Sequence, residues 1–114
     1  MSGNLSYFTI PTPDLQRGRA FYGGLFGWQF DAENSHDAYA HIGNTEPGGG
    51  LHAHEGTSVS VWFRVDEIQA AVARVRELGG HADEPALSDS GWRARCRDDQ
   101  GAGFNLWQPA QGFA

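Results

Sequence analysis

The sequence has no lysine, one cysteine and no long apolar run, and each absence excludes a class of protein. All eight basic residues are arginine, so chemistry through a Schiff base on a lysine amine is excluded. Cys96 is alone and can form neither an internal disulfide nor a cysteine-based zinc site, so we interpret it as a small buried apolar residue. No stretch reaches the ~18 apolar residues of a membrane span.

Acidic residues outnumber basic ones, which bears on the possible partners. The net charge is -6 and the pI is about 5.1, which disfavours nucleic acid and anionic membranes as partners. Residues 1–6 lack the basic end and apolar core of a secretion signal, so we expect a cytoplasmic protein. A length of 114 residues fits one domain, and we predict a single domain over residues 1–114.

The first half of the chain begins with a strand and a helix. Residues 6–10 are mostly aromatic or β-branched, and prolines follow them at positions 11 and 13. This pattern predicts a short strand that ends at the prolines. Asp14 can cap a helix that Gly27 would end. The apolar stripe expected on this helix comprises Leu15, Phe21, Tyr22, Leu25 and Phe26. We assign Trp28 to the same packing.

Three more strands follow in the first half, and the second half repeats the order. We predict strands at residues 28–31, 38–42 and 51–54, a turn at 34–36 and a glycine-rich turn at 44–50. The second half is predicted to contain a strand at 58–65, a helix from Asp66 to Gly79 with Gln69 in a capping box, strands at 81–83, 92–97 and 104–107, and a loop at 85–91. Each half therefore has one strand, one helix and three further strands. One such half cannot cover its own apolar sheet face, so two must pair, either within a chain or between two chains.

Several motifs resemble the vicinal oxygen chelate superfamily, which includes glyoxalases, bleomycin-resistance proteins and extradiol dioxygenases. They occur in the family's order along the chain: Thr12-Pro-Asp-Leu, Phe21-Tyr, Leu25-Phe-Gly-Trp, Val65-Asp, Gly79-Gly, Asp98-Asp-Gln-Gly-Ala and Phe104-Asn-Leu-Trp-Gln-Pro. The resemblance implies an α+β fold of two βαβββ modules, about residues 4–55 and 58–110, whose curved mixed sheets surround a cavity with the helices on the outer faces. It also implies a homodimer.

The family's metal enzymes carry ligands on the first and last strands of each module, and the matching residues are unusual here. The resemblance places Tyr7, Ser60 and Asn105 at three of these positions. None is a histidine or a carboxylate, the donors that a divalent metal prefers. We therefore expect no metal cofactor and no metal ligands at the usual positions.

Strand alternation predicts which side chains face the cavity. Arg93, Arg95 and Arg97 alternate with Trp92, Ala94 and Cys96, and the apolar residues must turn toward a helix. The arginines are then left on the concave face, where they could bind a carboxylate or a phosphate. Alternatively, Arg95 and Arg97 lie beyond the rim of the cavity and are solvated or paired with Asp98 and Asp99. The predicted ligand-binding residues are Tyr7, Thr9, His52, Ser60, Trp62, Arg64, Arg93, Arg95, Asn105 and Trp107.

His52 and His54 form the one pair with metal-like spacing. In a strand both side chains would leave the same face, and with a third ligand they could hold a divalent metal. They could instead act as general bases, or lie solvated at the end of a strand.

The sequence favours metal-independent binding of an aromatic small molecule, which could be anionic. Drug sequestration of the bleomycin-resistance kind is one role that such binding permits. The alternative is a lyase, isomerase or dioxygenase-like enzyme, using either a metal recruited by His52 and His54 or metal-free acid/base chemistry with Tyr7 and those histidines. Whether the protein is an enzyme stays open on sequence alone, and so do any catalytic residues. A regulator or subunit that retains the fold without a ligand is a third possibility.

Overall fold

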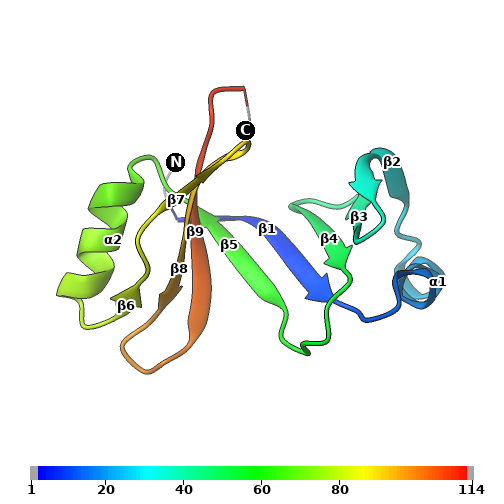
Figure 1. The fold of residues 1–114 in the computed structure, drawn as a ribbon, viewed down its shortest axis with the longest axis horizontal. Helices are drawn as coiled ribbons and strands as arrows, with labels where there is room; N and C mark the ends of the chain where they lie inside the picture. The colour runs from blue at the N-terminus through cyan, green and yellow to red at the C-terminus, as the bar shows by residue number, and fades with distance from the viewer. Residues whose placement is uncertain (1–2, 113–114) are drawn as a thin grey trace. The chain divides into compact units, whose positions relative to one another are not determined.

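A computed structural model describes residues 3–112, and the chain divides into two compact units. Of the described residues, unit 1 comprises 3–6 and 61–112, and unit 2 comprises 7–60. The described residues form two helices and nine strands. Figure 1 labels these elements on the ribbon. The predicted α+β class, with one helix and a mixed sheet in each half, is confirmed.

Unit 2 contains the first helix and most of the first four strands. Its elements are β1 (Asn4–Pro11), whose first residues belong to unit 1, α1 (Leu15–Phe26), β2 (Phe30–His36), β3 (Tyr39–Ile42) and β4 (Gly48–His52). In hydrogen-bonded order the strands are β2, β3, β4 and β1. The β1–β4 pair is parallel, and the other two pairs are antiparallel.

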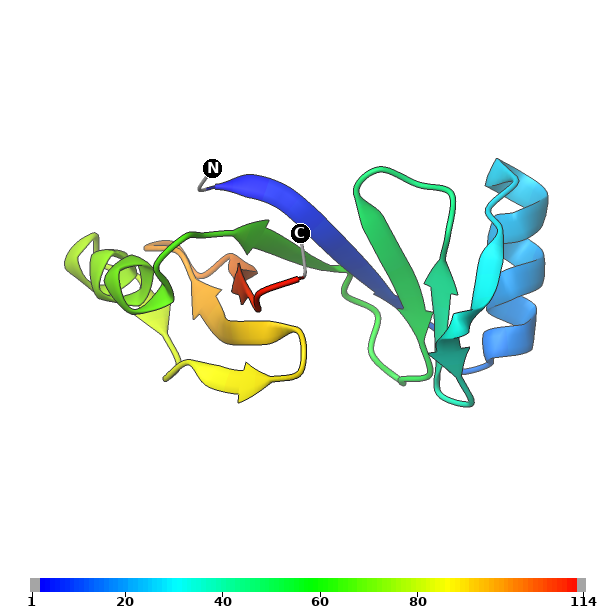
Figure 2. The same ribbon diagram turned by 90° about the horizontal axis from the view of Figure 1, so that it is seen from above.

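Unit 1 contains the second helix and the remaining strands. Its elements are β5 (Ser60–Arg64), α2 (Ile68–Glu77), β6 (His81–Ala82), β7 (Ala86–Ser88), β8 (Gly91–Arg97) and β9 (Gly103–Pro109). Strand β9 pairs in parallel with β5 and antiparallel with β8, and β8 pairs with both β6 and β7. Helix α2 packs against β6, β8 and β9, which is visible in Figure 2.

Helix α1 begins and ends where the sequence predicts. The Asp14 side chain accepts a hydrogen bond from the Arg17 amide at 3.1 Å, which satisfies one of the free N–H groups of the first turn. Gly27 ends the helix in the left-handed conformation, with φ 73°, where an L side chain would be strained.

The predicted apolar stripe of α1 is only partly correct. Leu15 and Tyr22 are half-buried and Gly18 is buried, so the contact face of the helix follows these three residues. Phe21 and Leu25 are instead exposed, as is Phe26. Glycine at position 18 lets the helix approach Leu51 closely.

Unit 2 is held together by one apolar sheet face under α1. Ile10 is in register with Leu51, which is in register with Ala40. Leu51 and Ala40 are fully buried. Register partners lie on the same face of a sheet, so this row forms the core of the unit.

Two boundaries in unit 2 differ from the sequence prediction. The expected turn at residues 34–36 is part of β2, which is irregular between Asp31 and His36 and is supported by Ser35 Oγ donating to the Asp31 carbonyl. The glycines from 48 to 50 begin β4 rather than a turn. Their missing side chains leave room for aromatic rings, because a Cβ at Gly49 would collide with Phe8 and one at Gly50 with Tyr39.

The core of unit 1 confirms the alternation predicted for β8. Ala94 and Cys96 are buried with Val72 of α2 and Leu106 of β9. Burial raises the pKa of the Cys96 thiol, as expected for an inert packing residue. Trp92 has the same parity but is 37% exposed, because it lies opposite Gln108 and outside this cluster.

Helix α2 starts later than predicted. Its N-cap is Glu67, whose side chain makes no capping bond, so the helix does not begin at Asp66 as predicted. The Ile68 amide is satisfied by Gln108 Oε1 at 2.7 Å. Leu78, the C-cap residue, is exposed.

The loop expected at residues 85–91 contains strand β7, which pairs with β8. This short strand escaped prediction because its residues have no clear alternation. Within residues 3–112, neither helix has the length and apolar character needed to cross a membrane.

Candidate functional site

Six of the ten predicted ligand-binding residues share one sheet face in unit 1. Trp107 is in register with Arg64 on β5 and with Arg93 on β8. Asn105 is in register with Trp62 and Arg95 in the same way. The two rows lie two residues apart, so they share the face opposite the α2 core.

Two polar atoms on this face are buried without a partner. Among the described residues, nothing forms a hydrogen bond with Trp62 Nε1 or Arg64 Nε. Both atoms are donors, and buried donors are seldom left unpaired in folded proteins. A ligand oxygen is one partner that could satisfy them.

Trp107 and Asn105 are fixed by backbone carbonyls. Trp107 Nε1 donates to the Ser90 carbonyl at 3.1 Å. Asn105 is buried, and its Nδ2 donates to the Val61 carbonyl at 3.1 Å. These bonds hold one aromatic ring and one amide in defined positions on the face.

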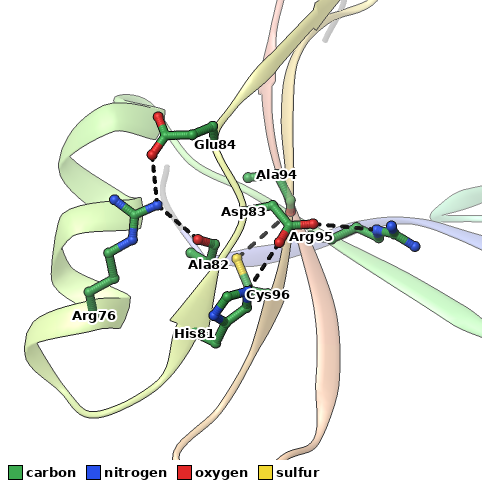
Figure 3. Close-up of polar contacts among 8 residues, drawn as sticks. All are labelled: Arg76, His81, Ala82, Asp83, Glu84, Ala94, Arg95 and Cys96. Atoms are coloured by element: carbon green, nitrogen blue, oxygen red, sulfur yellow. Dashed lines mark hydrogen bonds and ion pairs between the residues drawn. The ribbon is translucent and has the colours of Figure 1, made fainter.

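Arg95 and Arg97 lie at the exposed margin of unit 1. Arg95 Nε is 3.7 Å from Asp83 Oδ2 and its side chain is 84% exposed, and Figure 3 shows it directed to that carboxylate. Arg97 donates to the Gly101 carbonyl. The arginines thus reach Asp83 and a backbone oxygen rather than Asp98 or Asp99. Arg64 and Arg93 are the better candidates for binding an anion.

Unit 2 presents a second polar sheet face, which contains the remaining predicted residues except Ser60. Tyr7, Thr9 and Pro11 on β1 are in register with Gly48, Gly50 and His52 on β4. This face is opposite the row of Leu51. Ser60 begins β5 and is half-buried. That all ten residues line one cavity stays a prediction.

Sequence reasoning missed a histidine–aspartate pair on the unit 2 face. His41 is in register with Gly50 and with Asp31, and its Nδ1 is 2.7 Å from Asp31 Oδ2. This hydrogen bond is the largest influence lowering the pKa of the Asp31 carboxyl. The alternation of Tyr39 and His41 in β3 was a usable signal, but the pairing of His41 with Asp31 depends on the register between β2 and β3.

His52 and His54 do not leave a strand together as predicted. Strand β4 ends at His52, and the two rings stack at 5.3 Å. His54 Nδ1 accepts the Gly56 amide at 2.9 Å. Burial, and secondarily His54, lowers the pKa of His52.

The described residues do not fit a divalent metal at the positions the family uses. Tyr7 offers a phenol, and Asn105 uses its amide nitrogen toward Val61. Within residues 3–112, no three His, Cys, Asp or Glu side chains are grouped to hold a metal ion. The donor chemistry therefore gives no basis for a step that involves a metal.

Tyr7 is expected to ionise at a higher pH than an unperturbed tyrosine. Burial, and secondarily the Asp31 charge, raises the pKa of Tyr7 to about 12. The folded protein thus binds this proton more tightly than the unfolded chain, whose tyrosine pKa is near 10. The contribution to stability is complete below about pH 10 and is lost as the pH rises toward 12.

Absorbance at 295 nm between pH 9 and 13 checks this expectation. One of the three tyrosines should ionise near pH 12, and Tyr7→Phe should remove that step. Tyr22→Phe, the control, should leave it in place. A late step that persists in Tyr7→Phe would show that the assignment is wrong.

The fold defined by these two units is that of the vicinal oxygen chelate superfamily, and solved structures share it. The chain resembles the hypothetical protein BH1468 of Bacillus halodurans with a TM-score of 0.74 and 16% identity, covering 97% of each chain. It resembles methylmalonyl-CoA epimerase of Mycobacterium tuberculosis with a TM-score of 0.72 and 17% identity, covering 96% of this chain and 89% of the other. The homoprotocatechuate 2,3-dioxygenase of B. fuscum matches with a TM-score of 0.74 and 17% identity over 96% of this chain and 33% of that one.

The chain belongs to the glyoxalase-like domain family, whose model matches residues 7–107. It is 29% identical to CFP32 of Mycobacterium bovis, provisionally named a glyoxylase, over 93% of this chain and 46% of that protein. It is also 29% identical to the anthracycline biosynthesis protein DnrV of Streptomyces peucetius, over 97% of this chain and 43% of that protein. The chain thus spans about half the length of the curated relatives it matches.

Proposed function

We propose that this protein binds an aromatic small molecule bearing a carboxylate, without a metal, on the sheet face of unit 1. The observation that carries the proposal is the pair of buried donors, Trp62 Nε1 and Arg64 Nε, that lack a partner among the described residues. Both belong to the face that also holds Trp107 and Arg93.

The chemistry of the face agrees with such a ligand. Indole rings provide flat apolar surface for stacking, and a guanidinium group binds carboxylates through charge-assisted hydrogen bonds. The net charge of -6 would repel an anion at long range, so Arg64 and Arg93 must supply the local attraction. One relative is named for anthracycline biosynthesis, which agrees with a small-molecule ligand.

Drug sequestration by a cytoplasmic homodimer is the role we propose for this binding. Sequestration requires a site that holds its ligand, which agrees with the aromatic rings and hydrogen-bond donors of this face. Sedimentation velocity on the purified chain would test the dimer, and a monomer at all concentrations would contradict it.

Titration calorimetry with two matched probes tests the binding. 2-Naphthoate and 2-naphthamide have the same ring system but differ in charge, so a face built for an anion should prefer the naphthoate. Arg64→Gln should weaken naphthoate binding by about tenfold or more, because a hydrogen bond to a charged group contributes about 1.5–3 kcal/mol. The same change should affect naphthamide little.

Arg74→Gln is the control, since Arg74 is exposed on α2 and pairs with Glu77. It should leave both affinities unchanged, and EDTA should have no effect on either. No binding of either probe, or equal naphthoate affinity in Arg64→Gln, would overturn the proposal.

A further inference from the structure

The His41–Asp31 pair in unit 2 has the arrangement of a general base and its orienting carboxylate. His41 Nδ1 lies 2.7 Å from Asp31 Oδ2. An ionised carboxylate only accepts hydrogen bonds, so Nδ1 must carry the proton. In the neutral imidazole this leaves the lone pair on Nε2, and no described residue forms a hydrogen bond there.

Neighbouring groups hold the pair in place. Asp31 Oδ1 accepts the Asn34 amide at 3.0 Å. Ser35 Oγ accepts the His41 amide at 2.9 Å and donates to the Asp31 carbonyl. Asp31 faces His41 because the two residues are register partners in β2 and β3, and the bonds from Asn34 and Ser35 hold the irregular part of β2 that follows.

Tyr7 lies beside the imidazole with its hydroxyl available. The two rings stack with centroids 6.3 Å apart and an interplanar angle of 18°. No described residue makes a hydrogen bond with the Tyr7 hydroxyl, and its raised pKa keeps it protonated at neutral pH. A protonated phenol next to a base can donate a hydrogen bond to a substrate oxygen.

Tyr39 contributes a second hydroxyl at the same register. Its oxygen lies over Gly50, which is in register with both Thr9 and His41. Among residues 3–112 this buried oxygen has no hydrogen-bond partner. The face therefore has spare hydrogen-bonding capacity around the base.

A second histidine–aspartate pair, in unit 1, differs from the His41–Asp31 pair in its exposure and its neighbours. His81 Nε2 is 3.1 Å from Asp83 Oδ1, and the histidine side chain is 70% exposed. The close-up in Figure 3 shows the two side chains directed toward each other. Asp83 is shared with Arg95. By contrast, the His41 side chain is 24% exposed and has a phenol stacked against it.

We propose that unit 2 is a metal-free proton-transfer site for carbonyl compounds, with His41 as general base, Tyr7 as hydrogen-bond donor and Asp31 as positioning residue. His41 Nε2 takes a proton from the carbon next to the carbonyl. The electrons of that C–H bond form a C=C bond, and the carbonyl π electrons move to the oxygen, which accepts the Tyr7 hydrogen bond. The proton returns to the same carbon in the reverse step, so the reaction needs no oxidant or co-reactant. This proposal concerns a different face from the ligand site above and does not rest on it.

Hydrogen exchange in D₂O tests the reaction with 2-tetralone as the probe. This ketone has a flat ring and an acidic methylene next to the carbonyl, and proton NMR follows the loss of the methylene signal. The unaltered protein should accelerate exchange above buffer. His41→Gln should reduce the acceleration by about 10², and Tyr7→Phe should reduce it at least about tenfold.

His81→Gln is the matched control, since it removes a histidine from the exposed pair and should leave exchange unchanged. The tautomer of His41 gives an independent readout by nitrogen-15 NMR. We expect Nδ1–H in the unaltered protein and Nε2–H in Asp31→Asn, a change that a merely structural role for Asp31 would not produce. Exchange no faster than buffer, full exchange in His41→Gln, or an Nε2–H tautomer in the unaltered protein would each overturn the proposal.

Discussion

Replacing Gly91 by alanine should lower the free energy of unfolding by about 3 kcal/mol, through backbone strain and steric conflict together. Gly91 has φ +130°, and a Cβ built there lies 2.1 Å from the Gln108 carbonyl oxygen and 2.5 Å from the Ala110 amide nitrogen. Both obstacles are backbone atoms of the neighbouring chain segment, so no side-chain rotation relieves them. Denaturation by urea, followed by far-UV circular dichroism, measures the loss.

Gly101→Ala separates the two causes. Gly101 also has positive φ, +94°, but nothing lies within 4 Å of its Cβ position. Gly101→Ala should lower the free energy of unfolding by only about 1–2 kcal/mol, which is the strain of an alanine in a left-handed backbone conformation. Equal losses in the two variants would show that the close approach at Gly91 contributes nothing.

Gly91→Ala should also disturb the proposed ligand site. The neighbouring Ser90 carbonyl accepts both Trp107 Nε1 and the Ala110 amide. If the β8 strand shifts at its start, the bond that fixes the Trp107 ring is lost. A weaker affinity for 2-naphthoate in the folded variant is therefore expected.

Replacing Leu51 by alanine should lower the free energy of unfolding by about 3 kcal/mol, within the range for a fully buried leucine. Leu51 is 0% exposed and lies between Ile10 and Ala40 in the sheet. Its Cδ1 is 3.3 Å from the Cβ position of Gly18 in α1. Truncation leaves a cavity directly under the helix that covers unit 2.

Leu78→Ala is the control for Leu51→Ala. Leu78 is 61% exposed at the end of α2, and its replacement should change stability by no more than about 0.5 kcal/mol. NMR locates the effect, because Trp28 is in unit 2 whereas Trp62, Trp92 and Trp107 are in unit 1. In Leu51→Ala the Trp28 indole signal should change most, and equal changes at all four would contradict a local effect.

The sequence predicted the elements whose side chains alternate strongly or whose ends carry caps. Strand β8 is the clearest case, since Ala94 and Cys96 are buried exactly opposite an arginine face. Asp14 and Gly27 likewise marked the ends of α1. Local chemistry decides these features, so one sequence is enough to find them.

Other features depend on contacts between distant residues. The glycines of β4 were predicted as a turn because nothing in the local sequence shows that aromatic rings of β1 and β3 lie above them. The exposed Phe21 has the same origin, since helical spacing cannot tell how wide a sheet lies beneath a helix. The His41–Asp31 pair required the register between two strands. The common face of Arg64 and Trp107 in unit 1 was predictable because each of its strands alternates on its own.

Strand β1 contributes to both units, and this affects how the chain could be divided into two fragments. Its first residues belong to unit 1, where the Gly3 amide donates to the Arg64 carbonyl and Ser6 Oγ donates to the Trp62 carbonyl. From Tyr7 onward the same strand pairs with β4 in unit 2. Cutting the chain at residue 60 would therefore give a C-terminal fragment that lacks an edge neighbour for β5. Such a fragment should recover its native structure only when a peptide containing the first residues of β1 is added back.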